Sequence, residues 1–472
     1  MKSSSLRISA TVAVAVAGFC AVLVGQNRTV PPQPVANRLA PVGVPKPNFG
    51  TLVDRPATVM PTVPAGFTVS VYAELQAPRL MVYAPNGDLF VSSPAANNIT
   101  VFRDANNDGV FESRSVFAQG EVAPPRGAGP AGGAARGGGP GRGGPPPAPA
   151  PAASPNPEVN GPILGANAPA CVPPPPFNNP GPGTLAAPFG MAFNNGYLYV
   201  GNTGSIVRYK YTSGDLQAPG APEKLLDLPT GGHSTRNIIF NRAGTKMYVA
   251  VGSQSNNNAG EDCRRAAVLE FNPDGTGYRV YASGIRNPVG LTLQPGTDTV
   301  WIAMNERDNL GDDLVPDYAT SLKDGGFYGW PYSYIGSNYD PRYVGAFPDL
   351  VKRAIVPDVL FPAHSAALGI AFYTGTQFPQ RYRNGGFVAL HGSWNRSTAA
   401  GYKVAFFPMT NAKPGPLEDF MTGFLLRDGS GGTPVERWGR PVGVTVARDG
   451  SLLISDDGSN RIWKISAAAG AR

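Results

Sequence analysis

The feature that most constrains the fold is a phrase of three strands that recurs along the chain. Each copy has small residues, an alternating strand, a turn with glycine, a second apolar strand, a polar loop and a third strand. The clearest copies are PRLMVYAPNGDLFVSSPAANNITVFRD, which starts at Pro78, and RPVGVTVARDGSLLISDDGSNRIWKI, which starts at Arg440. Alternation of this kind between turn residues is typical of antiparallel strands.

About six copies occur, and each is too small to bury its own apolar face. The repeat therefore predicts an all-β protein, a six-bladed β-propeller of four-stranded antiparallel blades. A strand near Gly66 would close the ring by joining the last blade. A β-sandwich is the alternative, but sandwiches do not usually repeat one three-strand phrase along the chain.

The segments outside the repeats have a different composition. Lys2 and Arg7 accompany an apolar stretch, so residues 1–25 predict a signal peptide or an uncleaved anchor, and hence an exported protein, periplasmic or extracellular. Residues 26–60 are Pro-rich and predict an extended lead-in, and residues 61–468 contain the propeller. Residues 121–187 are rich in Gly, Pro and Ala and predict a disordered insertion, because they cannot bury enough apolar surface to offset their ordering entropy.

The charged residues and cysteines exclude some functions. The net charge is +7, but Lys and Arg are scattered, with no basic helix or aromatic-interleaved patch, which argues against a nucleic-acid partner. Membrane contact is expected only through an uncleaved N-terminal segment. Cleavage would leave Cys171 and Cys263, which could pair in an oxidising compartment or remain free thiols.

One acidic loop has the spacing of a calcium site. Oxygen-bearing side chains occur at Asp104, Asn106 and Asp108, glycine follows, and Glu112 stands at position nine. This matches the start of a calcium-binding loop, although Ser115 stands where an EF-hand has its glutamate. The loop predicts a structural calcium site or an ordinary acidic turn.

The polar loops between strands hold the candidates for chemistry. The chain has three histidines, His233, His364 and His391, each beside a Gly-rich or polar loop. His233 follows two glycines and precedes a short apolar strand, a position that suits a general base near neutral pH. Other loops collect arginines, carboxylates and tryptophans, which suit a flat, multiply anionic cofactor with a calcium ion or, alternatively, salt bridges between blades.

Several motifs carry a family resemblance. They are GGHSTRNIIF with VGSQSN, SGIRNPVGL, NERDNLGDD, KDGGFYGWPY and GRPVGVTVARDG. From about residue 60 to 468, without the insertion, the chain resembles the soluble pyrroloquinoline-quinone-dependent sugar dehydrogenases of the glucose/sorbosone dehydrogenase family, especially its sorbosone-dehydrogenase-like branch. The resemblance implies oxidation of an aldose or sugar aldehyde, pyrroloquinoline quinone (PQQ) and Ca²⁺ as cofactors, and a soluble or membrane electron acceptor.

The resemblance also implies roles for individual residues. His233 matches the general base, and Arg286, followed by Asn287, matches the arginine beside the reactive quinone carbonyl. Asp308 and Asn309 fall where main-chain carbonyls hold the cofactor calcium. The remaining assigned positions are Asp313 beside that calcium, and Arg440, Arg396 and Trp394 as cofactor contacts.

Three departures from the family pattern leave other functions open. Ser253 replaces the acidic partner of the base, Asp308 and Asn309 replace a Gly-Pro pair, and Val442 replaces a second arginine. These changes point to altered cofactor affinity, another substrate or a lost activity. The alternatives are a non-redox carbohydrate-binding propeller and a calcium-dependent, lactonase-like hydrolase.

Overall fold

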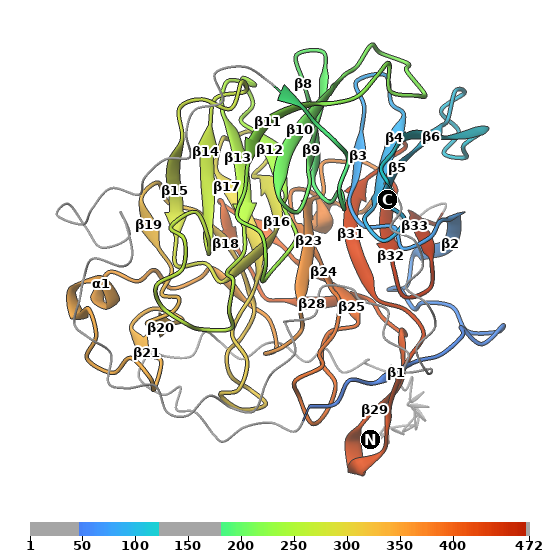
Figure 1. Ribbon diagram of the computed structural model, residues 1–472. Helices are drawn as coiled ribbons and strands as arrows, with labels where there is room; N and C mark the ends of the chain where they lie inside the picture. The colour runs from blue at the N-terminus through green and yellow to red at the C-terminus, as the bar shows by residue number, and fades with distance from the viewer. Residues whose placement is uncertain (1–46, 122–180, 469–472) are drawn as a thin grey trace, which may run out of the picture.

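The protein is an all-β structure with almost no helix. The computed structural model describes residues 47–121 and 181–468 (Figure 1). In these residues the one α-helix is α1 (Pro348–Lys352), with two short 3-10 helices, η3 (Gln380–Tyr382) and η4 (Ser430–Gly432). None of the helices in this part of the chain is long and apolar enough to span a membrane.

The described strands form six sheets of four or five strands and three smaller ones. The first three larger sheets are β3 (Met81–Tyr83), β4 (Leu89–Ser93), β5 (Asn98–Arg103) and β6 (Ser113–Gln119); β8 (Met191–Asn194), β9 (Tyr197–Gly201), β10 (Ser205–Lys210), β11 (Glu223–Asp227) and β7 (Gly181–Pro182); and β12 (Ile238–Phe240), β13 (Met247–Val251), β14 (Ala267–Phe271), β15 (Arg279–Ser283) and β19 (Gly326–Phe327).

The other three larger sheets continue the order of the chain. They are β16 (Asn287–Leu293), β17 (Val300–Asn305), β18 (Tyr318–Ser321) and β22 (Val359–Leu360); β23 (Ala367–Phe372), β24 (Gly386–Leu390), β25 (Lys403–Phe407) and β28 (Glu418–Met421); and β31 (Pro441–Val446), β32 (Leu452–Asp456), β33 (Arg461–Ala467) and β2 (Phe67–Glu74). The smaller sheets are β1 (Thr51–Leu52) with β30 (Val435–Arg437) and β29 (Leu425–Asp428), β20 (Ser333–Tyr334) with β21 (Asn338–Tyr339), and β26 (Met409–Thr410) with β27 (Lys413–Pro414).

The inner strands of the six larger sheets contact one another in a closed ring. β3 contacts β8, β8 contacts β12, β12 contacts β16, β16 contacts β23, β23 contacts β31, and β31 contacts β3. Glycines at Gly190, Gly290, Gly369 and Gly443 permit this approach, because a Cβ atom added at any of them would meet a main-chain oxygen of the next sheet at 2.5 Å or less. These glycines are the small residues of the sequence repeat.

The strand near Gly66 joins the last sheet, as the sequence predicts. β2 pairs antiparallel with β33, so an N-terminal strand completes a sheet made by the C-terminal residues. Phe67 of β2 packs edge-on against Phe378, Tyr382 and Phe420 of the preceding sheet region, with ring centroids 4.7 to 5.2 Å apart. β2 therefore links the two ends of the ring through main-chain and aromatic contacts.

Two predicted boundaries differ from the structure. The insertion predicted for residues 121–187 ends earlier, because β7 pairs with β11 and Leu185 is buried in the core. The predicted lead-in, residues 26–60, is not a free extended segment where it is described: β1 pairs in parallel with β30. In both places main-chain hydrogen bonds to a sheet edge order residues that the composition assigned to coil.

The closure by β2 gives a testable prediction. Replacing Phe67 with alanine should lower the free energy of unfolding by about 3 kcal/mol, because the substitution removes the contacts of the Phe67 ring with three other aromatic rings. Chemical denaturation of the purified chain measures this change. Val71→Ala is the matched control on the same strand, since Val71 is 41% exposed, and it should cost less than about 1 kcal/mol. Equal costs for the two variants would contradict a closing role for Phe67.

Candidate functional site

The candidate residues lie at one edge of the sheets. In each antiparallel sheet, the start of the inner strand and the loop between the second and third strands fall at the same edge. His233 precedes β12, Arg286 precedes β16 and Arg440 precedes β31, whereas Asp308 follows β17 and His391 follows β24. Because the inner strands form a ring, these loops gather around its centre.

His233 is half-buried and is oriented by the main chain. Its Nδ1 atom lies 2.8 Å from the carbonyl oxygen of Ser253 and 3.1 Å from the Ser253 hydroxyl. A proton on Nδ1 that is donated to this carbonyl leaves a lone pair on Nε2. Burial, together with the charge of Arg286, lowers the pKa of His233 to about 3, so the ring is neutral at physiological pH. The main-chain carbonyl thus takes the orienting role that the family gives to a carboxylate.

Two buried arginines hold the His233 loop. Arg236 is fully buried and donates to the carbonyls of His233, Thr235 and Pro229 at 2.7 to 2.8 Å. Arg265 donates to the carbonyls of Gly252 and Thr230. Neither guanidinium has a carboxylate within 4.0 Å among the described residues, and burial lowers the pKa of Arg236 to about 9. Neither arginine was predicted from the sequence as part of the site, although the position of Arg236, just before the strand residues IIF, was a signal for it.

Arg286 is buried, and protein acceptors occupy all of its donors. Its Nε donates to the carbonyl of Asn256 at 2.9 Å, and Nη1 donates to the carbonyls of Asn305 and Glu306. Its Nη2 contacts the Asn256 side-chain oxygen at 3.0 Å and Asp308 at 3.3 Å. The guanidinium therefore supplies positive charge to the site but has no unused N–H in this conformation.

Asp308 also pairs with His364, for which the sequence predicted no role. His364 Nδ1 lies 3.3 Å from the Asp308 carboxylate, and its Nε2 lies 2.9 Å from the Gly311 carbonyl. Burial alone would raise the pKa of Asp308, but the hydrogen bond from His364 and the charge of Arg286 lower it. Burial alone would lower the pKa of His364, but its hydrogen bond to Asp308 raises it. Asp308 therefore lies between the Arg286 guanidinium and the His364 imidazole, and both interactions favour its charged form.

The predicted calcium residues divide into two groups. The Asp308 carbonyl accepts a hydrogen bond from Asn256 at 3.1 Å, and Asn309, next to it, has a positive φ of 74°. Asp313 lies apart from this cluster: its side chain is 87% exposed and pairs with Arg396 at 2.8 Å. Arg396 and Asp313 therefore join two loops, one after β17 and one after β24.

A second group of charges surrounds His391. His391 Nε2 lies 2.8 Å from the Asp457 carboxylate, which also pairs with Arg79. Burial, together with the charge of Arg440, lowers the pKa of His391 to about 3, so it donates a hydrogen bond to Asp457 as a neutral ring. Arg440 donates from Nε to the His391 carbonyl at 3.3 Å and has no carboxylate within 4.0 Å among the residues described. Its guanidinium therefore keeps capacity for an anion.

Trp394 and Val442 have contacts that the sequence did not predict. The Trp394 ring stacks on Phe49 of the N-terminal segment, with centroids 5.4 Å apart and planes at 15°. Val442 is buried in a small apolar cluster with Phe189, Val289 and Leu368, one residue from each of four inner-strand regions. The valine that replaces an arginine of the family thus fills the centre of the ring.

The acidic loop lies at the opposite edge, between β5 and β6. Its carboxylate oxygens from Asp104, Asp108 and Glu112 lie within 4.8 Å of one another, which a single cation could bridge. The Asn106 side chain donates to Asp108 at 3.1 Å, so it stands beside the same cluster. Main-chain N–H groups of the loop also donate to Asp104 and Glu112. The loop is therefore separate from the His233 cluster.

Cys263 is disulfide-bonded, so the free-thiol alternative is wrong for this residue. Cys171, the partner considered from the sequence, lies outside the described residues.

Comparison with known proteins places the chain in a family. Residues 223–393 match the glucose/sorbosone dehydrogenase family model, and residues 351–468 match a TrAA12-like model. A Borreliella burgdorferi protein described as uncharacterized is 30% identical over 299 residues, 60% of this chain and 76% of that protein. The chain belongs to the glucose/sorbosone dehydrogenase family.

Two further relatives have named activities. The aldose sugar dehydrogenase YliI of Escherichia coli is 25% identical over 200 residues, 38% of this chain and 52% of that protein. The PQQ-dependent pyranose dehydrogenase of Coprinopsis cinerea is 26% identical over 298 residues, 50% of this chain and 40% of that protein. The chain thus matches about half of each protein's length or less.

Solved structures share the fold. The Trichoderma reesei carbohydrate-active enzyme of family AA12 has a TM-score of 0.63 and 16% identity, covering 88% of this chain and 100% of that one. The holo PQQ domain of the C. cinerea pyranose dehydrogenase has a TM-score of 0.61 and 19% identity, covering 88% and 98%. At these identities the likeness supports the β-propeller class of the fold alone.

The lowered pKa of His233 predicts a pH dependence of stability. Between the ordinary pKa of 6.5 and the folded value of about 3, the unfolded chain takes up a proton that the folded chain does not. The contribution of His233 is therefore present above pH 6.5 and is lost as the pH falls toward 3. Thermal unfolding at pH 7.5 and 4.5 should show a smaller loss of Tm in His233→Asn than in the wild type.

The same comparison between pH 7.5 and 9 is the control, because the imidazole is neutral in both states there. A difference between wild type and variant that stays constant from pH 7.5 to 4.5 would contradict the burial effect.

Proposed function

We propose that this chain is a quinoprotein dehydrogenase, built on a six-bladed β-propeller, that oxidises an aldose or a sorbosone-like sugar aldehyde with pyrroloquinoline quinone. The relatives named as sugar dehydrogenases support the reaction class. The closed ring of six inner strands supports the blade number. The observation that carries the proposal is a neutral His233 beside the buried cation Arg286, with Arg440 across the ring lacking a carboxylate partner.

The residues at the ring centre fit an anionic, planar cofactor in three respects. The Arg440 guanidinium keeps capacity for a carboxylate, which arginine binds with two parallel hydrogen bonds. The Asn287 side-chain oxygen is buried and has no hydrogen-bond partner among the described residues. The Asn395 side chain is fully buried, and its side-chain oxygen is also without a partner there. Buried polar groups of this kind usually mark a missing ligand, ion or water.

His233 is the proposed general base. Its Nε2 would take the proton of the sugar hydroxyl as the carbon beneath it loses hydride. When bound, pyrroloquinoline quinone supplies the carbonyl carbon C5 that accepts this hydride. The Ser253 carbonyl fixes the Nδ1–H tautomer but stabilises the imidazolium less than a carboxylate would, so the base is weaker than in the family pattern.

Arg286 and Trp394 need a modified role. Because the Arg286 donors are all used, this residue would stabilise developing negative charge by its field and would hold Asn256 and Asp308 in place. Trp394 would contact the cofactor only with the face or edge that Phe49 leaves open. Asn287 and Arg440 therefore become the main direct contacts in this proposal.

Calcium is proposed at two places. The main-chain carbonyls of Asp308 and Asn309 would hold the cofactor ion, while the Asp308 carboxylate stays paired with Arg286 and His364. The cluster of Asp104, Asp108 and Glu112 would hold a structural ion at the opposite edge.

Export and the electron partner complete the proposal. Residues 1–25, which lie outside the described residues, support export to the periplasm or the cell exterior, which N-terminal sequencing of the exported protein checks. A soluble or membrane acceptor would then reoxidise the cofactor.

Reconstitution tests the activity. The purified chain, with pyrroloquinoline quinone and Ca²⁺, should reduce an artificial dye when an aldose is added. His233→Asn should lower kcat by about 10²- to 10⁴-fold, because the general base is lost. Quinone binding should not change, because the proposed contact between Arg440 and a carboxylate of the quinone remains. Arg440→Leu should weaken quinone binding by about tenfold or more, read from the visible spectrum of the quinone.

If the wild type does not bind quinone at micromolar concentration, the dehydrogenase proposal is contradicted. That result would favour the non-redox carbohydrate-binding propeller instead.

Chelation tests calcium in the acidic loop. Addition of EGTA should lower the Tm of the wild type by about 3 °C, and Asp108→Asn should remove much of this difference. Asp349→Asn, an exposed aspartate on α1, is the matched control and should respond to EGTA like the wild type. An unchanged Tm with EGTA in the wild type would contradict the structural calcium site in the acidic loop.

A further inference from the structure

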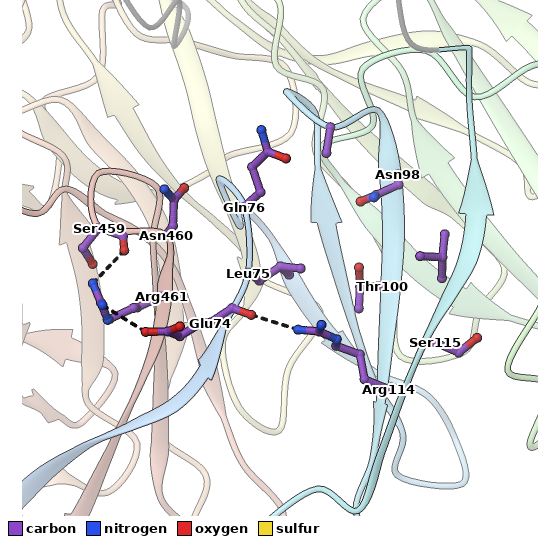
Figure 2. A pocket seen from close by; sticks show the side chains of 12 residues that line it. Glu74, Leu75, Gln76, Asn98, Thr100, Arg114, Ser115, Ser459, Asn460 and Arg461 are labelled. Atoms are coloured by element: carbon purple, nitrogen blue, oxygen red, sulfur yellow. Dashed lines mark hydrogen bonds and ion pairs between the residues drawn. The ribbon is translucent and has the colours of Figure 1, made fainter.

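A polar cavity lies between the first and last sheets, apart from the His233 cluster. Its volume is about 640 Å³, and its walls come from β5, β6, the end of β2 and the start of β33 (Figure 2). This volume is within the range of pockets that hold small organic ligands. The cavity lies where the two ends of the ring meet.

Two polar side chains on β5 line this cavity, and each has one buried oxygen without a hydrogen-bond partner among the described residues. Asn98 and Thr100 are two residues apart, so they share one face of the strand, and both line the cavity. Thr100 is 2% exposed, and neither its hydroxyl nor the Asn98 side-chain oxygen has a hydrogen-bond partner among the described residues. Further along the same face, Phe102 packs into an apolar cluster with Leu453 and Ile462. The face therefore changes from apolar to polar where the cavity begins.

The local strand geometry supports a built site. The register of β5 and β6 shifts between Ile99 and Thr100: Ile99 pairs with Ala118 and Thr100 with Val116, so Phe117 is the extra residue of a bulge in β6. Bulges are common beside binding sites, where they redirect side chains. Burying a hydroxyl without a partner costs free energy, so its retention here indicates that a ligand or water completes it.

The rest of the lining sets the chemistry of the ligand. Arg114 donates to the Glu74 carbonyl at 3.0 Å, and Arg461 pairs with the Glu74 carboxylate at 2.9 Å, as Figure 2 shows. Gln76, Asn460, Ser115 and Ser459 add amide and hydroxyl groups. The Asn98 oxygen requires a donor from the ligand, and Glu74 disfavours an anion beside Arg461. A molecule with many hydroxyl groups, which both donate and accept, meets these requirements.

We propose that this cavity is a binding site for a neutral saccharide, separate from the site of the proposed oxidation. Asn98 and Thr100 hydrogen-bond two sugar hydroxyls at the inner wall, Arg114 and Gln76 donate from the rim, and Leu75 and Val116 contact the C–H faces. This inference does not depend on quinone chemistry.

Saccharide binding to the purified chain without quinone tests the site. Saturation-transfer NMR and calorimetry with maltose and with D-glucose should detect binding to the wild type. Thr100→Val keeps the side-chain shape and should weaken binding about three- to tenfold, the value of one hydrogen bond. Ser115→Trp should fill the cavity and abolish binding there.

Ser113→Trp is the matched control on β6, because Ser113 is exposed and does not line the cavity. It should bind like the wild type, and Tm values close to that of the wild type establish that each variant folds. His233→Asn should also retain this binding, and dye reduction by a reconstituted Thr100→Val should match the wild type. The proposal is overturned if neither sugar binds, if Ser115→Trp binds as tightly as Ser113→Trp, or if inorganic phosphate binds in place of sugar.

Discussion

The close approach of neighbouring inner strands is the constraint on which the rest of the structure depends. Glycines in β16, β23, β31 and just before β8 let each main chain lie against the next, and any side chain there would force the sheets apart. The residues one position earlier then fall at the ring centre, where Phe189, Val289, Leu368 and Val442 pack together. The same geometry brings the loops with His233, Arg286 and Asp308 to one edge, above this apolar floor.

The site above that floor is held mainly by arginines that bind carbonyl oxygens. Arg236 and Arg265 fix the His233 loop, and Arg286 fixes Asn256 and Asp308. Buried charge of this kind is costly unless it is hydrogen-bonded, so moving a loop away from its arginine would cost free energy. For a ligand there remain the Nε2 lone pair of His233, the Arg440 guanidinium, which has no carboxylate partner among the described residues, and the buried Asn287 side-chain oxygen. The loops around the site are therefore fixed by hydrogen bonds, whereas the polar groups at its centre can still bind a ligand.

The sequence predicted the features that depend on local pattern. Strand alternation and the recurring three-strand phrase predicted the all-β fold and the N-terminal strand that joins the last sheet. It did not predict the pairing of His364 with Asp308 or the stacking of Phe49 on Trp394, because these contacts join segments far apart in the chain. The bulge at Phe117 of β6 was also not predicted, because only the pairing with β5 defines it.

The stacking of Phe49 on Trp394 has a consequence for how the protein meets other surfaces. Asn48 donates to the Trp394 carbonyl, and Arg437 donates to the carbonyls of Phe49 and Gly50, so the described chain starts beside the loops of the candidate site (Figure 1). A support joined directly ahead of this segment would lie near the candidate site. For the proposed dehydrogenase, immobilisation at this end would shorten the path for electrons to an electrode, whereas attachment at the acidic loop would place the full thickness of the sheets between them.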